Sequence, residues 1–181
     1  MAGIIRRIDE LGRIVLPKEL RKILNLNTGD ALEISLSANV INVKKYLPLS
    51  KNINEITEIA KILNKSTNKS VIITDKESVI YSNGKLDYLK GEKLSEKALE
   101  IINKNSSFSL SKKDGAQPIK ITKNGLEDCF IQIIMPISSG ESKAYGLVAI
   151  CGFEENQNFD ATDIKLLKFV CEMLYSYYGE N

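Results

Sequence analysis

Short apolar runs alternate with polar turns over the first 46 residues. Leu32, Ile34 and Leu36 alternate with polar positions, which is the period of a strand with one buried face. Pro17 fits the first turn of a helix, where its missing N–H leaves no hydrogen bond unmade. The predicted elements are strands at 4–8 and 13–16, a helix that begins near Pro17, and a hairpin with strands at 32–36 and 41–44.

After a predicted boundary at 47–50, the pattern changes to that of a larger domain of helices and strands. Apolar residues recur at spacings of 3, 4 and 3 from Ile53, which predicts a helix over 51–64. Ser95 and Asp160 are placed as N-caps of two further helices. The predicted strands lie at 71–74, 78–81, 119–122, 129–136 and 145–153, with a loop at 105–113. The last two strands are almost continuously apolar, as in a sheet covered on both faces.

Two features of this pattern predict association between chains. The first 50 residues have no disulfide pattern or metal motif, and segments this small seldom bury enough apolar surface alone. The final predicted helix has two adjacent apolar seams, more than one sheet can cover. We therefore expect a homodimer through the first segment and a second contact through the later helices.

Composition removes several classes of function. The chain contains no His, which excludes Ser-His-Asp and Cys-His catalysis and His-ligated haem or zinc. Its three Cys are far apart and form no CxxC pair, which favours a reduced compartment. The charged N-terminus lacks the apolar region of a signal peptide, and the longest uncharged stretch, 129–140, is too short for a membrane span. We expect a cytoplasmic protein with no membrane contact, no cofactor, no metal and no catalytic residue.

The basic charge is concentrated near the N-terminus. Residues 1–50 carry a net charge of +3 and residues 51–181 a net charge of −1. All four Arg, against 21 Lys in the whole chain, lie between Arg6 and Arg21. Abundant Ile, Lys and Asn suggest an AT-rich coding bias that replaces most surface Arg by Lys. Arg retained in one cluster then indicates a need for the planar, bidentate guanidinium.

The motif Gly3-x-x-Arg6-x-x-Asp9-x-x-Gly12-Arg13-x-x-x-Pro17, followed by Glu19-Leu20-Arg21-Lys22 and Gly29-Asp30-x-Leu32-Glu33-Ile34, closely resembles the AbrB family of bacterial transition-state regulators. The resemblance covers about residues 3–47. It implies a swapped-hairpin β-barrel, in which two chains interlace their strands to bind double-stranded DNA. The implied DNA-binding residues are Arg6, Arg7, Arg13, Lys18, Arg21 and Lys22. Lys22 stands where the family often has Arg. For each single Arg, the alternative is a solvated charge or an ion pair with Asp9, Glu10 or Glu19.

The order and length of the elements after residue 50 are similar to those of a GAF domain. The resulting fold is α+β, with an AbrB-like domain at 1–50 and a GAF-like sensor or oligomerisation domain at 51–181, whose antiparallel sheet has flanking helices. The combined resemblance implies a sporulation regulator that forms a homotetramer through its GAF helices. Residues Asp75, Tyr81, Asp128, Cys129 and Tyr145 are candidates to line a pocket for an unidentified small-molecule effector. A GAF-like module without any ligand is the alternative.

Two other functions remain open at this point. Similar swapped-hairpin proteins act as antitoxins that wrap a partner protein with a disordered tail, although the C-terminal part of this chain is apolar and periodic. Some GAF-fold proteins reduce methionine sulfoxide through cysteines. Cys171 lies in an apolar helical register, which predicts a buried thiol instead of a reactive one.

Overall fold

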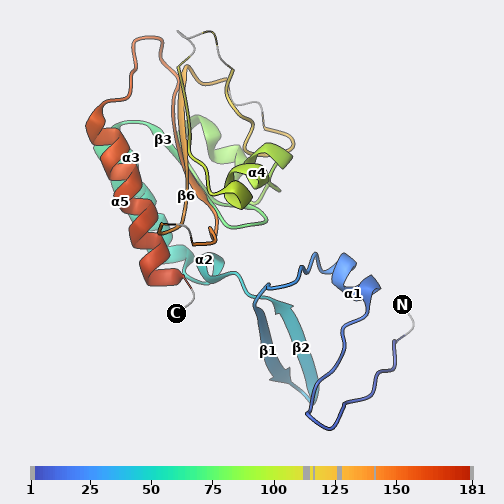
Figure 1. Cartoon of the computed structure of the whole chain (residues 1–181). Coiled ribbons are helices and arrows are strands. Elements are labelled where there is room, and N and C mark those ends of the chain that lie inside the picture. The colour runs from blue at the N-terminus through green and yellow to red at the C-terminus, as the bar shows by residue number, and fades with distance from the viewer. Residues whose placement is uncertain (1–2, 112–114, 116, 126–127, 141, 180–181) are drawn as a thin grey trace. The chain divides into compact units, whose positions relative to one another are not determined.

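The computed structural model describes residues 3–111, 115, 117–125, 128–140 and 142–179 (Figure 1). The chain divides into two compact units, Met1–Tyr46 and Leu47–Asn181. Among the described residues, no helix has both the length and the apolar character needed to cross a membrane.

The first unit contains one short helix and one hairpin. These elements are α1 (Lys18–Ile23), β1 (Leu32–Ser37) and β2 (Val40–Lys45). The strands are antiparallel, with Leu32 opposite Lys45. Ala38 and Asn39 form the loop with φ values of 45° and 63°, which suits a type I′ turn whose twist matches the strands. The predicted helix and hairpin are therefore confirmed.

The predictions of strands at 4–8 and 13–16 are wrong for the single chain, in which both segments are extended without ladder pairing. Within 3–46, Pro17 is the one buried residue that the structure describes. The apolar side chains left exposed there are Ile4, Ile5, Ile8, Leu11, Ile14, Val15, Ile23, Leu24, Leu32, Ile34, Leu36, Val40 and Ile41. A strand needs a neighbour to satisfy its backbone groups and to cover its apolar face, and one copy of this unit supplies neither.

The second unit is a five-stranded antiparallel sheet with helices on both faces (Figure 1). Its helices are α2 (Pro48–Lys51), α3 (Ile53–Thr67), the 3₁₀ helix η1 (Gly84–Leu89), α4 (Glu96–Lys104) and α5 (Ala161–Tyr178). Its strands are β3 (Ser70–Thr74), β4 (Val79–Ser82), β5 (Phe108–Ser111), β6 (Ile131–Pro136) and β7 (Leu147–Gly152), in the spatial order β4-β3-β7-β6-β5.

Each face of this sheet carries its own hydrophobic core. Along β7, Val148 and Ile150 join the cluster under α3 and α5, whereas Ala149 and Cys151 join the cluster under α4 and η1. Every residue of β7 is buried. The prediction of an apolar strand covered on both faces is therefore confirmed.

The predicted N-caps are also confirmed. The Ser95 hydroxyl accepts a hydrogen bond from the backbone N–H of Ala98 at the start of α4. At α5, Asp160 accepts from the backbone N–H of Asp163, and Asp163 accepts in return from that of Asp160, which completes a capping box. The bond from the Asp163 N–H is the main reason that the pKa of Asp160 lies below its ordinary value.

Three element predictions in the second unit also need correction. Residues 108–111, predicted as loop, form the edge strand β5, because Phe108 packs against the core under α4. Residues 119–122, predicted as a strand, make one isolated bridge, between Thr122 and Leu94. The buried Gln132 amide replaces a neighbouring strand there, since it bonds both the N–H and the C=O of Ile119, at 2.8 and 2.9 Å.

The third correction concerns the helix predicted to begin at residue 51. Asn52, with φ −111°, separates α2 from α3, so that the segment forms two helices. Leu49 in α2 is fully buried and anchors the start of this unit in the core under α3 and α5.

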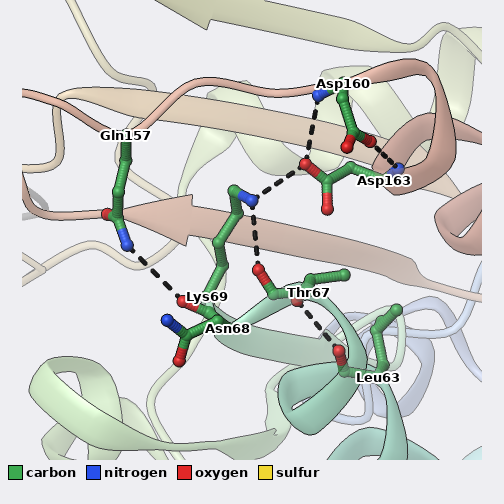
Figure 2. A network of polar contacts seen from close by, with 7 residues as sticks. All are labelled: Leu63, Thr67, Asn68, Lys69, Gln157, Asp160 and Asp163. Carbon is green, nitrogen blue, oxygen red and sulfur yellow. Dashed lines mark hydrogen bonds and ion pairs between the residues drawn. The ribbon is translucent and has the colours of Figure 1, made fainter.

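A buried ion pair joins the C-terminal end of α3 to the N-terminal end of α5 (Figure 2). The Lys69 ammonium lies 2.8 Å from Oδ2 of Asp163 and 3.1 Å from the carbonyl oxygen of Thr67. The two charged side chains are only 10% and 8% exposed. The cation thus lies at the negative end of one helix dipole and the anion at the positive end of the other. This arrangement fixes α3 and α5 side by side.

Candidate nucleic-acid interface

The six predicted DNA-binding residues all lie in the first unit with exposed side chains. Arg6 and Arg7 belong to the extended N-terminal segment, and Arg13 follows the turn at 9–12. Lys18, Arg21 and Lys22 lie on α1. With the residues that the structure describes, only Arg13 of the six forms an ion pair. The other five cations are therefore available to an anionic partner.

The turn before Arg13 is built around the side chain of Asp9. Its Oδ1 accepts hydrogen bonds from the backbone N–H of Leu11 at 3.0 Å and of Arg13 at 2.8 Å. Its Oδ2 accepts from Nε of Arg13 at 2.7 Å. Gly12 has φ +76°, a conformation that other residues rarely adopt. The backbone N–H of Arg13, followed by its guanidinium, holds the pKa of Asp9 below its ordinary value.

An ion pair that sequence reasoning missed connects the loop after α1 to the hairpin. Nζ of Lys45 lies 3.1 Å from Oδ2 of Asp30, and these side chains are 12% and 7% exposed. The same Asp30 oxygen accepts from the backbone N–H of Asn27, and Nζ of Lys45 also donates to the carbonyl of Asn25. The pair holds the chain that follows α1 against β2. No spacing rule could indicate it, because the partners are far apart in sequence.

The predicted pocket residues lie in different parts of the second unit. Asp75 is 2% exposed and accepts hydrogen bonds from the backbone N–H groups of Glu77 and Ser78 and from the hydroxyl of Ser50. It therefore closes the turn between β3 and β4 and holds α2 there.

The other four pocket candidates lie on both sides of the sheet. Tyr81 and Tyr145 pack with the core under α3 and α5, where burial raises the pKa of Tyr81. Cys129 is fully buried in the core under α4, and Asp128 is exposed. The structure thus does not gather the candidates into one cluster, and a pocket among them stays a prediction.

A hollow of about 490 Å³ lies beside α5 and the end of β6. Its lining includes Asn105, Met135, Lys168 and Cys171. Burial raises the pKa of the Cys171 thiol, which disfavours the reactive thiolate. Across the described ranges, no group of three or more His, Cys, Asp or Glu is placed to hold a metal ion.

Family comparisons divide the chain into the same two parts. Residues 52–176 match the family described as "Stage V sporulation protein T C-terminal, transcription factor". Residues 5–46 match the family described as "Antidote-toxin recognition MazE, bacterial antitoxin".

Relatives in Bacillus subtilis (strain 168) match either most of the chain or a stretch of 46 residues. Stage V sporulation protein T is 36% identical over 129 residues, which cover 70% of each chain. The transition state regulatory protein AbrB is 52% identical over 46 residues, which cover 25% of this chain and 48% of AbrB. The putative transition state regulator Abh is 46% identical over 46 residues, or half of its length. The first unit is therefore AbrB-like.

Solved structures at low identity show the fold of the second unit. A GAF domain/HD domain protein from Geobacter sulfurreducens has a TM-score of 0.51 at 14% identity, covering 71% of this chain and 92% of that one. A type II free methionine-R-sulfoxide reductase from Thermoplasma acidophilum has a TM-score of 0.51 at 10% identity, covering 72% and 97%. The second unit is thus GAF-like. With the match over residues 52–176 and the 36% identity to its namesake, the chain belongs to the stage V sporulation protein T family of transcription factors.

Proposed function

We propose that this protein regulates sporulation or transition-state genes by binding double-stranded DNA through its first unit as a homodimer. One observation carries the proposal: this unit presents its six basic side chains on a segment that has no core of its own. Cations of this kind neutralise phosphates, and Arg also forks onto guanine edges. The AbrB relative, named as a transition state regulatory protein, supports the same function.

The homodimer follows from the uncovered apolar surface of the first unit. The extended segments around Ile5 and Val15 form no strand pairing with the residues that the structure describes, and these two side chains are 89% and 76% exposed. A second copy would supply the missing strands and cover both the segments and the hairpin. In this proposal two chains interlace in one barrel, as in the AbrB-like fold that the sequence predicts.

The second unit would join dimers into a homotetramer through α3 and α5. These helices pack side by side and cover the sheet on their inner faces. Their outer faces keep large apolar side chains in solvent: Ile62 is 65% exposed, Phe169 62% and Tyr177 76%. Two such helix pairs, packed together, would bury these side chains.

We predict that replacing Arg by Lys weakens DNA binding although the net charge is unchanged. Arg13→Lys and Arg6→Lys should each lose about 1–3 kcal/mol, because Lys cannot make a bidentate contact. For about 8 phosphate contacts per dimer, the logarithm of the DNA-binding constant of the wild-type protein should fall with the logarithm of the salt concentration with a slope near −7. The Lys variants should keep that slope, because each retains its positive charge. Equilibrium titration of DNA at three salt concentrations measures both quantities. Lys44→Ala, on the hairpin, removes a charge outside the Arg cluster and should cause a smaller loss of affinity.

Two results would contradict the DNA-binding proposal. If the wild-type protein does not bind fragments of genomic DNA, the proposed DNA-binding function is refuted. If both Lys variants bind DNA with wild-type affinity, the Arg residues supply only positive charge, and their clustering reflects coding bias and not a bidentate contact.

A small-molecule effector in the GAF-like unit is the regulatory part of the proposal. An effector that binds one arrangement of the tetramer more tightly would change the affinity for DNA, with a coupling free energy between the two sites of about 1–3 kcal/mol. A metabolite screen by thermal shift, followed by DNA titration with each hit, measures this coupling. If no metabolite shifts the melting temperature, the unit is an oligomerisation module.

Neither alternative function, antitoxin or methionine sulfoxide reductase, is favoured by the residues that the structure describes. An antitoxin tail of the disordered kind would follow the first unit, but here that position holds an ordered GAF-like domain. The likeness to a methionine sulfoxide reductase extends to the fold alone, and Cys171 is 3% exposed with a raised pKa. We therefore infer a regulator that works in the cytoplasm without chemistry of its own.

A further inference from the structure

An acidic residue lies in the middle of the basic segment. Asp9 is the direct partner of Arg13, with 2.7 Å between Oδ2 and Nε. Any carboxylate close to a DNA phosphate weakens binding through repulsion, so a surface optimised for charge alone would not carry one here. The structure must give Asp9 a compensating role.

The geometry of the pair indicates that role. Oδ1 of Asp9 is occupied by the backbone N–H groups of Leu11 and Arg13, so the carboxylate is fixed to the turn by bonds of 3.0 and 2.8 Å. Oδ2 then holds Arg13 at Nε, and no other partner of the guanidinium is recorded among the described residues. The Arg13 side chain is 71% exposed. Nη1 and Nη2 carry four further N–H donors, and the two on the end-on edge of the guanidinium form a fork that is separate from the Nε edge held by Asp9.

We infer that Asp9 is a positioning residue for Arg13 in DNA recognition. Its carboxylate holds the Nε edge of the guanidinium and presents the Nη1 and Nη2 donors as a prepared fork for a guanine edge or a phosphate. An unrestrained Arg must lose rotamer freedom when it binds, and a restrained one has lost part of that freedom already. The inference rests on the proposed function, because it requires that Arg13 contacts DNA.

The test compares two substitutions that remove the same charge from the same turn. Asp9→Asn keeps an oxygen for the backbone N–H groups but replaces Oδ2 by an NH₂ group, which cannot accept from Nε. Glu10→Gln is the control, since no contact of Glu10 is recorded within the described residues. The probe is the duplex that wild-type protein protects in a footprint of genomic DNA. Asp9→Asn should bind it about 5- to 30-fold more weakly, part of the contribution of one bidentate contact. Glu10→Gln should bind as tightly as wild type or more tightly.

A second background separates positioning from a structural role in the turn. In Arg13→Ala protein there is no guanidinium to position, so adding Asp9→Asn should leave affinity unchanged or raise it. An equal loss in both backgrounds would show that Asp9 acts only through the turn and would overturn the inference. Affinity of Asp9→Asn at or above the wild-type value would also overturn it. Failure of wild-type protein to bind any DNA would instead contradict the proposed function.

Discussion

Phe169→Glu combined with Tyr177→Glu is expected to convert the proposed tetramer into a dimer and to weaken binding to long operator DNA by about 10²–10⁴-fold. The two side chains lie two helical turns apart on the outside of α5, 62% and 76% exposed. In a tetramer both side chains would be buried. The variant would then place four carboxylates from each pair of chains in an interface without water, where they repel one another. Light scattering measures the mass, and equilibrium titration measures the affinity.

The size of the expected loss comes from effective concentration. Two dimeric DNA-binding heads joined in one tetramer make the second binding event intramolecular, without any new contact to DNA. A short duplex with a single site should therefore bind the variant and the wild type equally. Tyr88→Glu is the matched control, because Tyr88 is an aromatic residue of similar exposure, 58%, on η1. A variant that remains tetrameric, or a dimer that binds the long duplex as tightly as wild type, would refute the role assigned to the α3 and α5 faces.

Local signals account for the parts of the fold that the sequence predicts well. A capping residue acts on backbone groups within three positions, so Ser95 and Asp160 identify their helices without knowledge of the rest of the chain. The alternating apolar positions of the hairpin are also a local signal, because the two strands and the two-residue loop between them are contiguous in sequence. The resemblance of the first 47 residues to the AbrB family likewise rests on closely spaced residues.

The remaining parts depend on distant contacts. Residues 108–111 pair with β6, whose partner residues lie twenty or more positions later. The side chain of Gln132 satisfies the backbone of Ile119, in the segment 119–122 that was expected to form a strand. Strands at 4–8 and 13–16 require a neighbour that one chain does not contain. In each case the decisive partner is outside any short window of sequence.

The same limit applies to the candidate site. Residue type and clustering predict the Arg set as a DNA-binding site, and the pairing of Arg13 with Asp9 is one of the alternatives that the sequence offers. By contrast, the ion pairs of Asp30 with Lys45 and of Lys69 with Asp163 join different elements and have no sequence signature. The first pair holds the chain after α1 against β2, and the second joins the ends of α3 and α5, so these contacts become visible only in the structure.

Lys69→Met is expected to lower the free energy of unfolding of the GAF-like unit by about 3–5 kcal/mol, because removing one partner of a buried pair leaves an uncompensated charge. Met keeps most of the apolar stem, so the change isolates the ammonium group (Figure 2). The carboxylate of Asp163 is 8% exposed and would lose its contact at 2.8 Å, while the carbonyl of Thr67 would lose a donor. Urea denaturation followed by circular dichroism measures the loss.

Lys61→Met provides the control on the same stretch of chain. Lys61 pairs with Glu58 at 2.7 Å, but these side chains are 58% and 68% exposed, so water screens the pair and its removal should leave unfolding nearly unchanged. Adding Asp163→Leu to Lys69→Met removes the stranded charge and should restore part of the lost stability, although the capping box at α5 is then incomplete. Equal, small effects of Lys69→Met and Lys61→Met would mean that the buried pair does not fix α3 against α5. In that case the face proposed for tetramer assembly would have to be held by apolar packing alone.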